Sequence, residues 1–187
     1  MGMVDFCAID FETATHEPNS ACELGICIVE NGTITRSKSW LIKPPSFPYF
    51  NPRMVEVHGI TPNDVQHAPY FDQVWEEINS ELYGHLLIAH NASFDMRVLK
   101  GTLEYYGLFA PRNSYLCSVG LSKKSWRGMA SYGLKNLCTV HGIKFNHHRA
   151  EDDAYACAQI ALLAFERLLL TCNEEVYSYC KNQIKKL

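Results

Sequence analysis

The chain has 187 residues, of which 47% are hydrophobic, with 17 basic and 20 acidic side chains and a formal net charge of −3. This length predicts one domain, residues 1–187, with a sizeable core. The charge excludes a strongly basic nucleic-acid coat protein, but it does not exclude an enzyme that reaches phosphate groups through bound metal.

Cysteine spacing and the N-terminal residues argue against three further classes of protein. The eight cysteines include no C-x-x-C pair, so the spacing of a structural zinc site is missing. The N-terminal segment has no basic region and apolar stretch leading to a cleavage site, so no secretory signal is expected. The sequence contains no run of about 18 apolar residues, so no membrane span is expected. We therefore expect a cytoplasmic protein with reduced thiols and no membrane partner.

The first 42 residues predict three strands. Residues 3–12 are apolar on both faces for most of their length, which is typical of a strand in the middle of a sheet. Residues 22–30 predict a second strand and residues 33–42 a third. Asn31 and Gly32 between them are typical of a hairpin turn, so the sheet is expected to begin as an antiparallel meander.

The middle of the chain alternates between loops, helices and a strand. Residues 43–52 are rich in proline and predict a loop, and residues 57–65 predict a short turn or helix. Apolar residues with helical spacing predict a helix over 70–84. The short apolar run 85–91 predicts a fourth strand, and residues 93–107 predict a helix.

The last third of the chain predicts one strand followed by three helices. Residues 115–119 predict a fifth strand, and the polar run 122–130 a loop. Helices are expected over 131–142, 151–170 and 173–186. Strands first, then strands alternating with helices, predict an α/β fold with a mixed sheet flanked by helices.

Four acidic residues are placed where a ligand site is expected. Asp10 and Glu12 share one face of the first strand, and buried like charges are costly unless they are paired. Asp95 and Asp153 lie in the first turns of two predicted helices, and strand ends and helix starts are where α/β folds assemble ligand sites. Taken alone, an aspartate at a helix start can simply be a charge stabilised by the helix dipole.

The absence of cysteine and histidine from this acidic set indicates the kind of metal. Oxygen ligands suit Mg²⁺ or Mn²⁺ rather than zinc. Two such ions, about 3.5–4 Å apart, would clamp the attacking and leaving oxygens of a phosphoryl displacement. The carboxylates therefore predict a site for divalent cations.

Three motifs resemble those of the DnaQ-like DEDDh 3′–5′ exonucleases, the family that includes proofreading subunits, RNase T and oligoribonuclease. The family's D-x-E-T motif is similar to residues 10–13. Its second motif is similar to "HNASFDMRVL", in which Asp95 is the last residue of N-x-x-F-D. Its H-x-A-x-x-D-A motif matches residues 148–154, and "VHGITPNDV" resembles the linker between the first two motifs. The resemblance spans about residues 4–160 in the family's order. Ala14 departs from it, because many members have D-x-E-T-T-G, so the following turn is expected to differ.

The resemblance implies an RNase H-like fold with a five-stranded mixed sheet and a single exonuclease domain, residues 1–187. It also implies that Asp10, Glu12, Asp95 and Asp153 ligate two ions, Mg²⁺ or Mn²⁺, and that His148 is the general base. Histidine titrates near neutrality and can accept a proton from water, which agrees with that role. His147 is one position out of register and is expected to be a solvated side chain.

The resemblance implies that Thr13 contacts the sugar of the terminal nucleotide. It also implies that five further residues bind substrate in the same cleft: Phe11, His58, His90, Asn91 and Phe94. Phe11 can equally be a core residue, since it alternates with Ile9. Two mixed groups can bind nucleic acid through stacking or phosphate contacts, or can be ordinary packed or solvated loops. These groups are Phe47, Tyr49, Phe50 and Met54, and Lys123, Lys124, Trp126 and Arg127.

The resemblance implies a metal-dependent 3′–5′ exonuclease that hydrolyses single-stranded 3′ ends and releases nucleoside 5′-monophosphates. DNA is slightly favoured over RNA, because the linker motif looks closer to the proofreading group. The alternatives are a 3′–5′ exoribonuclease, or a non-catalytic nucleic-acid-binding module. A polymerase or repair partner, hence a role in proofreading or DNA repair, and a homodimer remain open.

Overall fold

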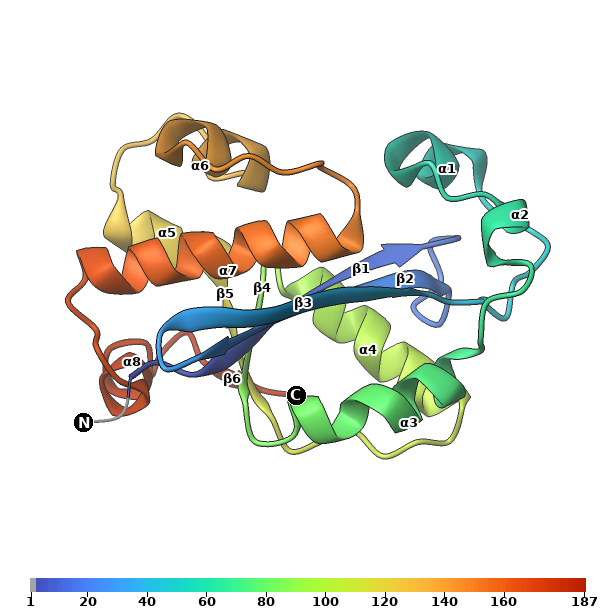
Figure 1. Ribbon diagram of the computed structural model, residues 1–187, viewed down its shortest axis with the longest axis horizontal. Helices are drawn as coiled ribbons and strands as arrows, with labels where there is room; N and C mark the ends of the chain where they lie inside the picture. The colour runs from blue at the N-terminus through green and yellow to red at the C-terminus, as the bar shows by residue number, and fades with distance from the viewer. Residues whose placement is uncertain (1–2) are drawn as a thin grey trace.

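The computed structural model describes residues 3–187 and contains one six-stranded mixed sheet (Figure 1). The strands, in chain order, are β1 (Phe6–Thr13), β2 (Ala21–Glu30), β3 (Thr33–Leu41), β4 (Leu86–Ala89), β5 (Ser114–Cys117) and β6 (Lys185–Lys186). Their order across the sheet is β3-β2-β1-β4-β5-β6. β1 is antiparallel to β2 and parallel to β4, so the predicted mixed sheet with an antiparallel start is confirmed.

The sixth strand corrects the prediction of five. The expected helix over 173–186 ends early, as α8 (Asn173–Tyr179), and β6 then pairs antiparallel with Ser114 and Tyr115 of β5. The backbone N–H of Leu187 also donates to the carbonyl of Asn113, at 3.0 Å. A pairing across the unpaired edge of a sheet leaves no local periodicity in the sequence, so helical spacing alone could not predict it.

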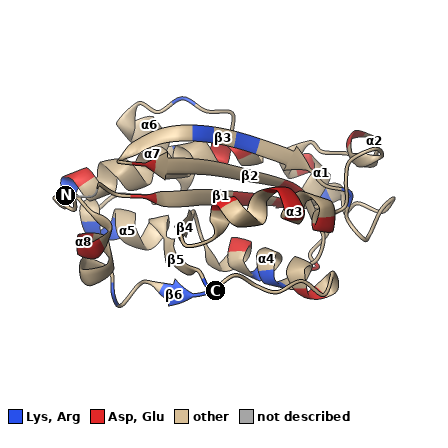
Figure 2. Cartoon of the chain, turned by 60° about the horizontal axis from the view of Figure 1, so that its bottom comes forward, with Lys and Arg blue, Asp and Glu red and all other residues tan. Residues whose placement is uncertain are grey.

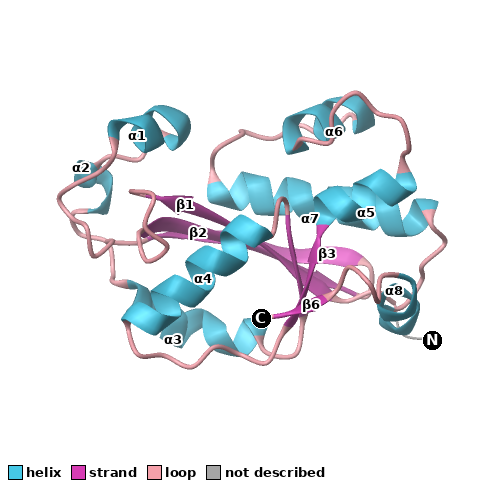
Figure 3. Cartoon of the chain, turned by 180° about the vertical axis from the view of Figure 1, so that it is seen from behind, coloured by secondary structure: helices cyan, strands magenta, loops and turns pink. Residues whose placement is uncertain are grey.

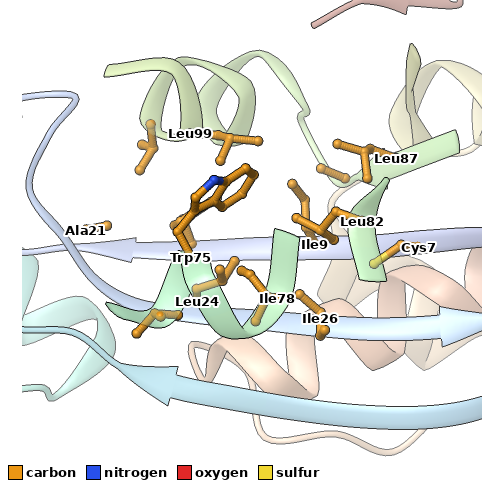
Figure 4. Close-up of a cluster of buried hydrophobic side chains, with 14 of the residues drawn as sticks. Cys7, Ile9, Ala21, Leu24, Ile26, Trp75, Ile78, Leu82, Leu87 and Leu99 are labelled. Carbon is orange, nitrogen blue, oxygen red and sulfur yellow. The ribbon is translucent and has the colours of Figure 1, made fainter. Parts of the chain in front are cut away.

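Helices cover both faces of the sheet, as Figure 3 shows from behind. On one face, α3 (Phe71–Leu82) and α4 (Ser93–Tyr105) pack on the odd-numbered residues of β1, including Ile9 and Phe11. The close-up in Figure 4 shows this cluster, with Ile78 and Leu82 of α3 among the strand residues and the ring of Trp75 directed toward Leu99 of α4. Burial of large apolar side chains of this kind is the main stabilising contribution to the fold.

On the other face, α7 (Ala150–Arg167) runs across the central strands and packs on Phe6 and Ala8 of β1. Three alanines, Ala154, Ala158 and Ala161, give α7 a face of small side chains, which lets the helix lie close to the sheet. α6 (Leu134–His141) packs on the outer side of α7. The helices predicted over 70–84, 93–107, 131–142 and 151–170 are therefore confirmed, with ends shifted by a few residues.

Two helical segments were not fully predicted. α1 (Pro52–His58) begins where Asn51 accepts the N–H of Arg53 at 3.0 Å and ends at Gly59, which has φ +75°. Proline at a helix start and glycine after its end are known signals, so α1 was predictable. α2 (Pro62–Val65) lies within the expected turn or helix.

The second missed helix, α5 (Ser118–Ser125), replaces the end of the predicted fifth strand and part of the predicted loop. Its serines look polar in the sequence, yet Ser118, Ser122 and Ser125 are buried. The hydroxyl of Ser125 donates to the carbonyl of Leu121 at 3.0 Å, so the helix backbone satisfies it. Within residues 3–187, no helix is long and apolar enough to cross a membrane.

Candidate active site

β1 carries Asp10 and Glu12 on the face of the sheet that α7 covers. They share this face with Phe6 and Ala8, because side chains alternate along a strand, and both are half-buried. One carboxylate oxygen from each lies within 4.8 Å of an oxygen of Asp153, in the first turn of α7. The structure therefore brings together three of the four predicted ligands at the start of α7.

Asp95, the fourth predicted ligand, lies in the first turn of α4, directly after β4. Its Oδ1 accepts the backbone N–H of Phe11 at 3.1 Å, which ties α4 to β1 beside Asp10. Its Oδ2 is buried and has no hydrogen-bond partner in the described part of the chain. A buried carboxylate oxygen without a partner carries a desolvation cost, unless a cation or another donor meets it.

The loop before α7 brings both histidines to Asp153. The Nδ1 of His147 lies 2.8 Å from Asp153 Oδ1, and the backbone N–H of His148 donates to Oδ2 at 2.7 Å. The two rings stack with their centroids 3.8 Å apart, and His148 has φ +70°. His147 is exposed, as expected, but its ring also contacts Asp153, which the expectation of a solvated side chain did not include. A one-residue register argument could not show this, since the turn brings both rings to one side.

Burial and mutual repulsion raise the pKa values of the acidic groups. Burial first, and then Asp153 and Glu23, raise the pKa of Glu12 to about 8. Burial raises the pKa of Asp95 to about 7, against the opposing effect of the hydrogen bond from Phe11. The pKa of Asp10 is raised well above its ordinary value by burial, then by Asp95 and Asp153. Without a counter-charge, the folded protein therefore resists full ionisation of this site.

The residues of the site fit a divalent cation. Among residues 3–187, none of the four predicted ligands forms an ion pair with lysine or arginine. The basic segments of β3 (blue in Figure 2) are already paired, because Arg36 and Lys38 contact Glu81 and Glu77 of α3. Carboxylate oxygens are the ligands that Mg²⁺ and Mn²⁺ prefer. A bound cation would meet the charge that the protein itself leaves uncompensated.

In the metal-free protein, we expect the free energy of unfolding to fall as the pH rises from about 6.5 to about 8. Folded Glu12 and Asp95, with pKa values of about 8 and about 7, keep protons that the unfolded chain has already released. The stability present at low pH is therefore lost as the pH passes these folded-state values. Each such proton contributes a slope of about 1.4 kcal/mol per pH unit.

Urea unfolding in a chelating buffer, at half-unit steps across this window, measures the slope. Below about pH 6.5, His90 makes the free energy of unfolding rise with pH and so opposes this slope. Burial lowers the pKa of His90 to about 4, so in this range only the unfolded chain carries a charged imidazole. The control is the same series in saturating Mg²⁺, which should flatten the slope. A flat or rising profile in the chelator would contradict the raised pKa values.

The six predicted substrate residues occupy different environments. Phe11 is 2% exposed and packs in the core on the opposite face from Asp10, which is the alternative role considered for it. Thr13 is buried at the end of β1, and its carbonyl accepts from His58 Nε2 at 3.1 Å. His58 Nδ1 accepts the N–H of Ile60 at 3.0 Å, so neither ring nitrogen of His58 is free for substrate.

The other three predicted substrate residues surround the start of α4. The Nδ1 of His90 lies 2.8 Å from the hydroxyl of Ser118, and its Nε2 is buried with no hydrogen-bond partner among residues 3–187. Asn91 is exposed and has φ +66°, and Phe94 is half-buried next to Asp95. Asn91 and Phe94 are therefore accessible at the edge of the acidic site, whereas His58 and His90 are engaged within the fold.

Both mixed aromatic and basic groups predicted from the sequence are partly packed against the fold, although Tyr49, Lys123 and Arg127 are exposed. Phe50 is buried, and Lys43 lies over the ring of Phe47, at 4.4 Å from its centroid. Lys124 lies over Tyr179, at 4.9 Å, and Trp126 packs against His141 with ring centroids 4.3 Å apart. These contacts support the packed-loop alternative for much of both groups.

One acidic residue of the site was missed by the sequence argument. Glu23 of β2 stands directly opposite Glu12 of β1 and is 1% exposed. Its signal was present, because a charge inside the apolar run 22–30 is as unusual as the charges at the end of the first strand. Glu23 is also among the groups that raise the pKa of Glu12.

A mixed sheet with an acidic cluster between its central strand and two helix starts is the arrangement of the RNase H-like exonuclease class. The family model for exonucleases matches residues 7–161. The chain belongs to the DnaQ-like DEDDh exonuclease family. The match covers every predicted site residue, which confirms the family that the three motifs indicated.

Relatives and solved structures agree with this assignment. The chain is 30% identical to a protein named 3′-5′ exonuclease DinG from Staphylococcus aureus, over 99% of this chain and 21% of the relative. The chain thus spans about a fifth of the length of the curated relatives that it matches. Exonuclease X, solved in complex with 5′ overhanging duplex DNA, is 26% identical, with a TM-score of 0.70 over 86% of this chain and 91% of its own.

A third comparison shows the fold alone. A 3′-exonuclease solved for 3′-end specific recognition of a histone mRNA stem-loop has a TM-score of 0.77. It covers all of this chain and 92% of its own, at 16% identity. The RNase H-like arrangement of sheet and helices therefore extends over the whole chain.

Proposed function

We propose that residues 1–187 form a 3′–5′ exonuclease domain that hydrolyses the terminal phosphodiester bond of single-stranded nucleic acid. The observation that carries this proposal is the meeting of Asp10, Glu12 and Asp153 within 4.8 Å, with His148 on the adjoining loop. The reaction would release nucleoside 5′-monophosphates. The family membership and the name of the DinG relative support the reaction class and its direction.

Asp10, Glu12, Asp95 and Asp153 are proposed to hold two divalent ions, Mg²⁺ or Mn²⁺. Bound ions of this kind supply Lewis-acid activation of water and stabilise charge on the leaving oxygen. The raised pKa values and the partnerless Oδ2 of Asp95 support this assignment, because both reflect negative charge without a cation. His147 also contacts the carboxylate of Asp153, one of the four proposed ligands.

His148 is proposed to accept the proton of the attacking water. Burial and the neighbouring His147 lower its pKa, so the ring is neutral and able to accept a proton near pH 7. The hydrogen bond from its backbone N–H to Asp153 holds the loop beside the acidic cluster. Base and carboxylates are thereby kept together by a contact of 2.7 Å.

Single-stranded DNA is the substrate that we favour, with Thr13, Asn91 and Phe94 around its terminal nucleotide. His58 and His90 are proposed to support this cleft from within, because both ring nitrogens of His58 and the Nδ1 of His90 contact groups of the fold. The complex of Exonuclease X with DNA supports DNA over RNA as the first substrate to test. A polymerase or repair partner and a homodimer remain predictions.

A 5′-labelled single strand tests the direction of digestion. We expect a ladder that shortens one nucleotide at a time in Mg²⁺ or Mn²⁺, with no digestion when the 3′ end is blocked. Matched DNA and RNA strands in parallel reactions compare the sugars, and faster RNA digestion would make the domain an exoribonuclease. Cuts within a circular single strand would contradict the exonuclease assignment.

A further inference from the structure

Glu23 connects the sheet to the start of α7. Its Oε2 accepts the backbone N–H of Ala150, the first residue of α7, at 3.2 Å. Its Oε1 accepts the hydroxyl of Ser39 on β3 at 2.9 Å, and Arg149 Nη2 lies 3.9 Å from the same oxygen. With 1% exposure, Glu23 makes these contacts away from water.

The N–H of Ala150 needs an acceptor from outside its own helix. The first N–H groups of an α-helix have no intrahelical partner and are usually capped by a nearby side chain. Arg149 occupies the N-cap position and its side chain makes no capping hydrogen bond. Ala150 is fully buried, so solvent does not meet its backbone. Glu23, 127 residues earlier in the chain, supplies the missing acceptor.

Gly25 makes this contact between β2 and α7 possible. A Cβ atom at position 25 would lie 2.0 Å from the carbonyl oxygen of Ala150, so only glycine leaves room for the helix. Gly25 pairs with Asp10 across β1 and β2, just as Glu23 pairs with Glu12. Cross-strand partners share a face of the sheet, so the start of α7 rests on the face that carries the predicted ligands.

The same turn of α7 positions two more groups of the site. Asp153 belongs to this turn, and its N–H donates to the carbonyl of Arg149 at 2.9 Å. Its carboxylate accepts the N–H of His148 at 2.7 Å. A displacement of the first turn would therefore move Asp153 and His148 together, relative to Asp10 and Glu12 on β1.

We propose that Glu23 is a positioning residue, which holds the first turn of α7 on β2 so that Asp153 and His148 face Asp10 and Glu12. The proposal rests on the exonuclease function proposed above for its kinetic consequence, but not for its structural one. Both carboxylate oxygens of Glu23 accept hydrogen bonds within the fold, so Glu23 acts through Ala150 and is not itself a ligand. What matters in this role is an acceptor oxygen, not a negative charge.

Two substitutions separate the acceptor from the charge. Glu23→Gln keeps a carbonyl oxygen for the N–H of Ala150 and offers an N–H₂ group to the Ser39 hydroxyl, but it removes the charge. Glu23→Ala removes both. Glu30→Ala is the matched control, because Glu30 is the exposed last residue of the same strand. Each variant is compared with the parent protein in two measurements.

The first measurement is hydrogen exchange at the Ala150 amide in metal-free protein, followed by NMR, which needs no activity. We expect Glu23→Gln and Glu30→Ala to keep the protection of the parent, and Glu23→Ala to lose it. The second is kcat and KM at saturating Mg²⁺. We expect kcat to fall about 10–100-fold in Glu23→Ala, the usual effect of losing an outer-shell partner, and to stay within about 3-fold of the parent in Glu23→Gln. KM should change little in either variant.

Two results would overturn the proposal. One is an unchanged Ala150 exchange rate and kcat in Glu23→Ala. The other is a large loss of kcat in Glu23→Gln with its Ala150 protection intact, which would make the charge decisive. If Glu23→Ala does not fold, Glu23→Gln alone tests the proposal, and a large loss of kcat with intact Ala150 protection overturns it. Absence of nuclease activity in the parent would refute the proposed function, while the exchange data would still test the contact.

Discussion

Asp10→Asn is expected to lower kcat at least about 10³-fold at saturating Mg²⁺ or Mn²⁺, while leaving the fold intact. Changes in the outer shell of a metal site typically cost about 10–100-fold, so removal of a proposed ligand from its centre should cost more. Asp10 is repelled by each of the other three carboxylates, because Asp95, Asp153 and Glu12 all raise its pKa. Single-turnover digestion of a labelled strand measures the loss.

The same substitution should stabilise the metal-free protein at neutral pH, because a neutral amide removes repulsion among buried carboxylates. Unfolding by urea, with chelator and with Mg²⁺, separates this effect from metal binding. Asp152→Asn is the matched control, since Asp152 is next to Asp153 but is not among the residues whose carboxylate oxygens meet within 4.8 Å. Near-parental turnover of Asp10→Asn at saturating metal would refute the two-ion assignment.

His148→Ala is expected to lower kcat by about 10²–10⁴-fold, the usual scale for a positioned proton acceptor. Metal binding should persist in this variant, because all four carboxylates remain. The structure sharpens the comparison with His147→Ala. His147 contacts Asp153 through its ring, so its loss should change the metal concentration needed for half-maximal rate more than kcat itself.

Titration of the rate against Mg²⁺ for the parent and both alanine variants distinguishes these two effects. If His147→Ala were the variant with the large loss in kcat, the two histidines would have exchanged roles and the motif register would be wrong. If neither lost activity, water activation would not depend on a histidine. Thermal unfolding of the metal-free variants serves as the control for folding.

Much of the site was predictable because its signals are local. Asp10 and Glu12 share a face by the two-residue period of a strand, and Asp95 and Asp153 follow from helix starts. The mixed sheet and the two faces of β1 likewise follow from alternation of apolar residues. The acidic set could be recognised from sequence because a buried strand seldom carries two charges.

The remaining features depend on which segments meet in space. β6 pairs with the free edge of β5, and within α5 the hydroxyl of Ser125 donates to the carbonyl of Leu121. Phe11 lies in the core and His58 bonds to the backbone of Thr13 and Ile60, which no motif could show. The packing of neighbouring elements decides whether the side chain of such a residue faces the site or the core.

By itself, the sequence determined the family and most of the strands and helices along the chain, and it predicted the four carboxylates with His148 as the site. These predictions follow from residue types and short spacings, because the periods of strands and helices are local properties of the chain. Only the tertiary structure decided that His147 contacts Asp153 and that Glu23 accepts the N–H of Ala150. The physical reason is distance along the chain: an acceptor 127 residues from its donor leaves no period or spacing to read, and the two meet only when α7 packs on β2.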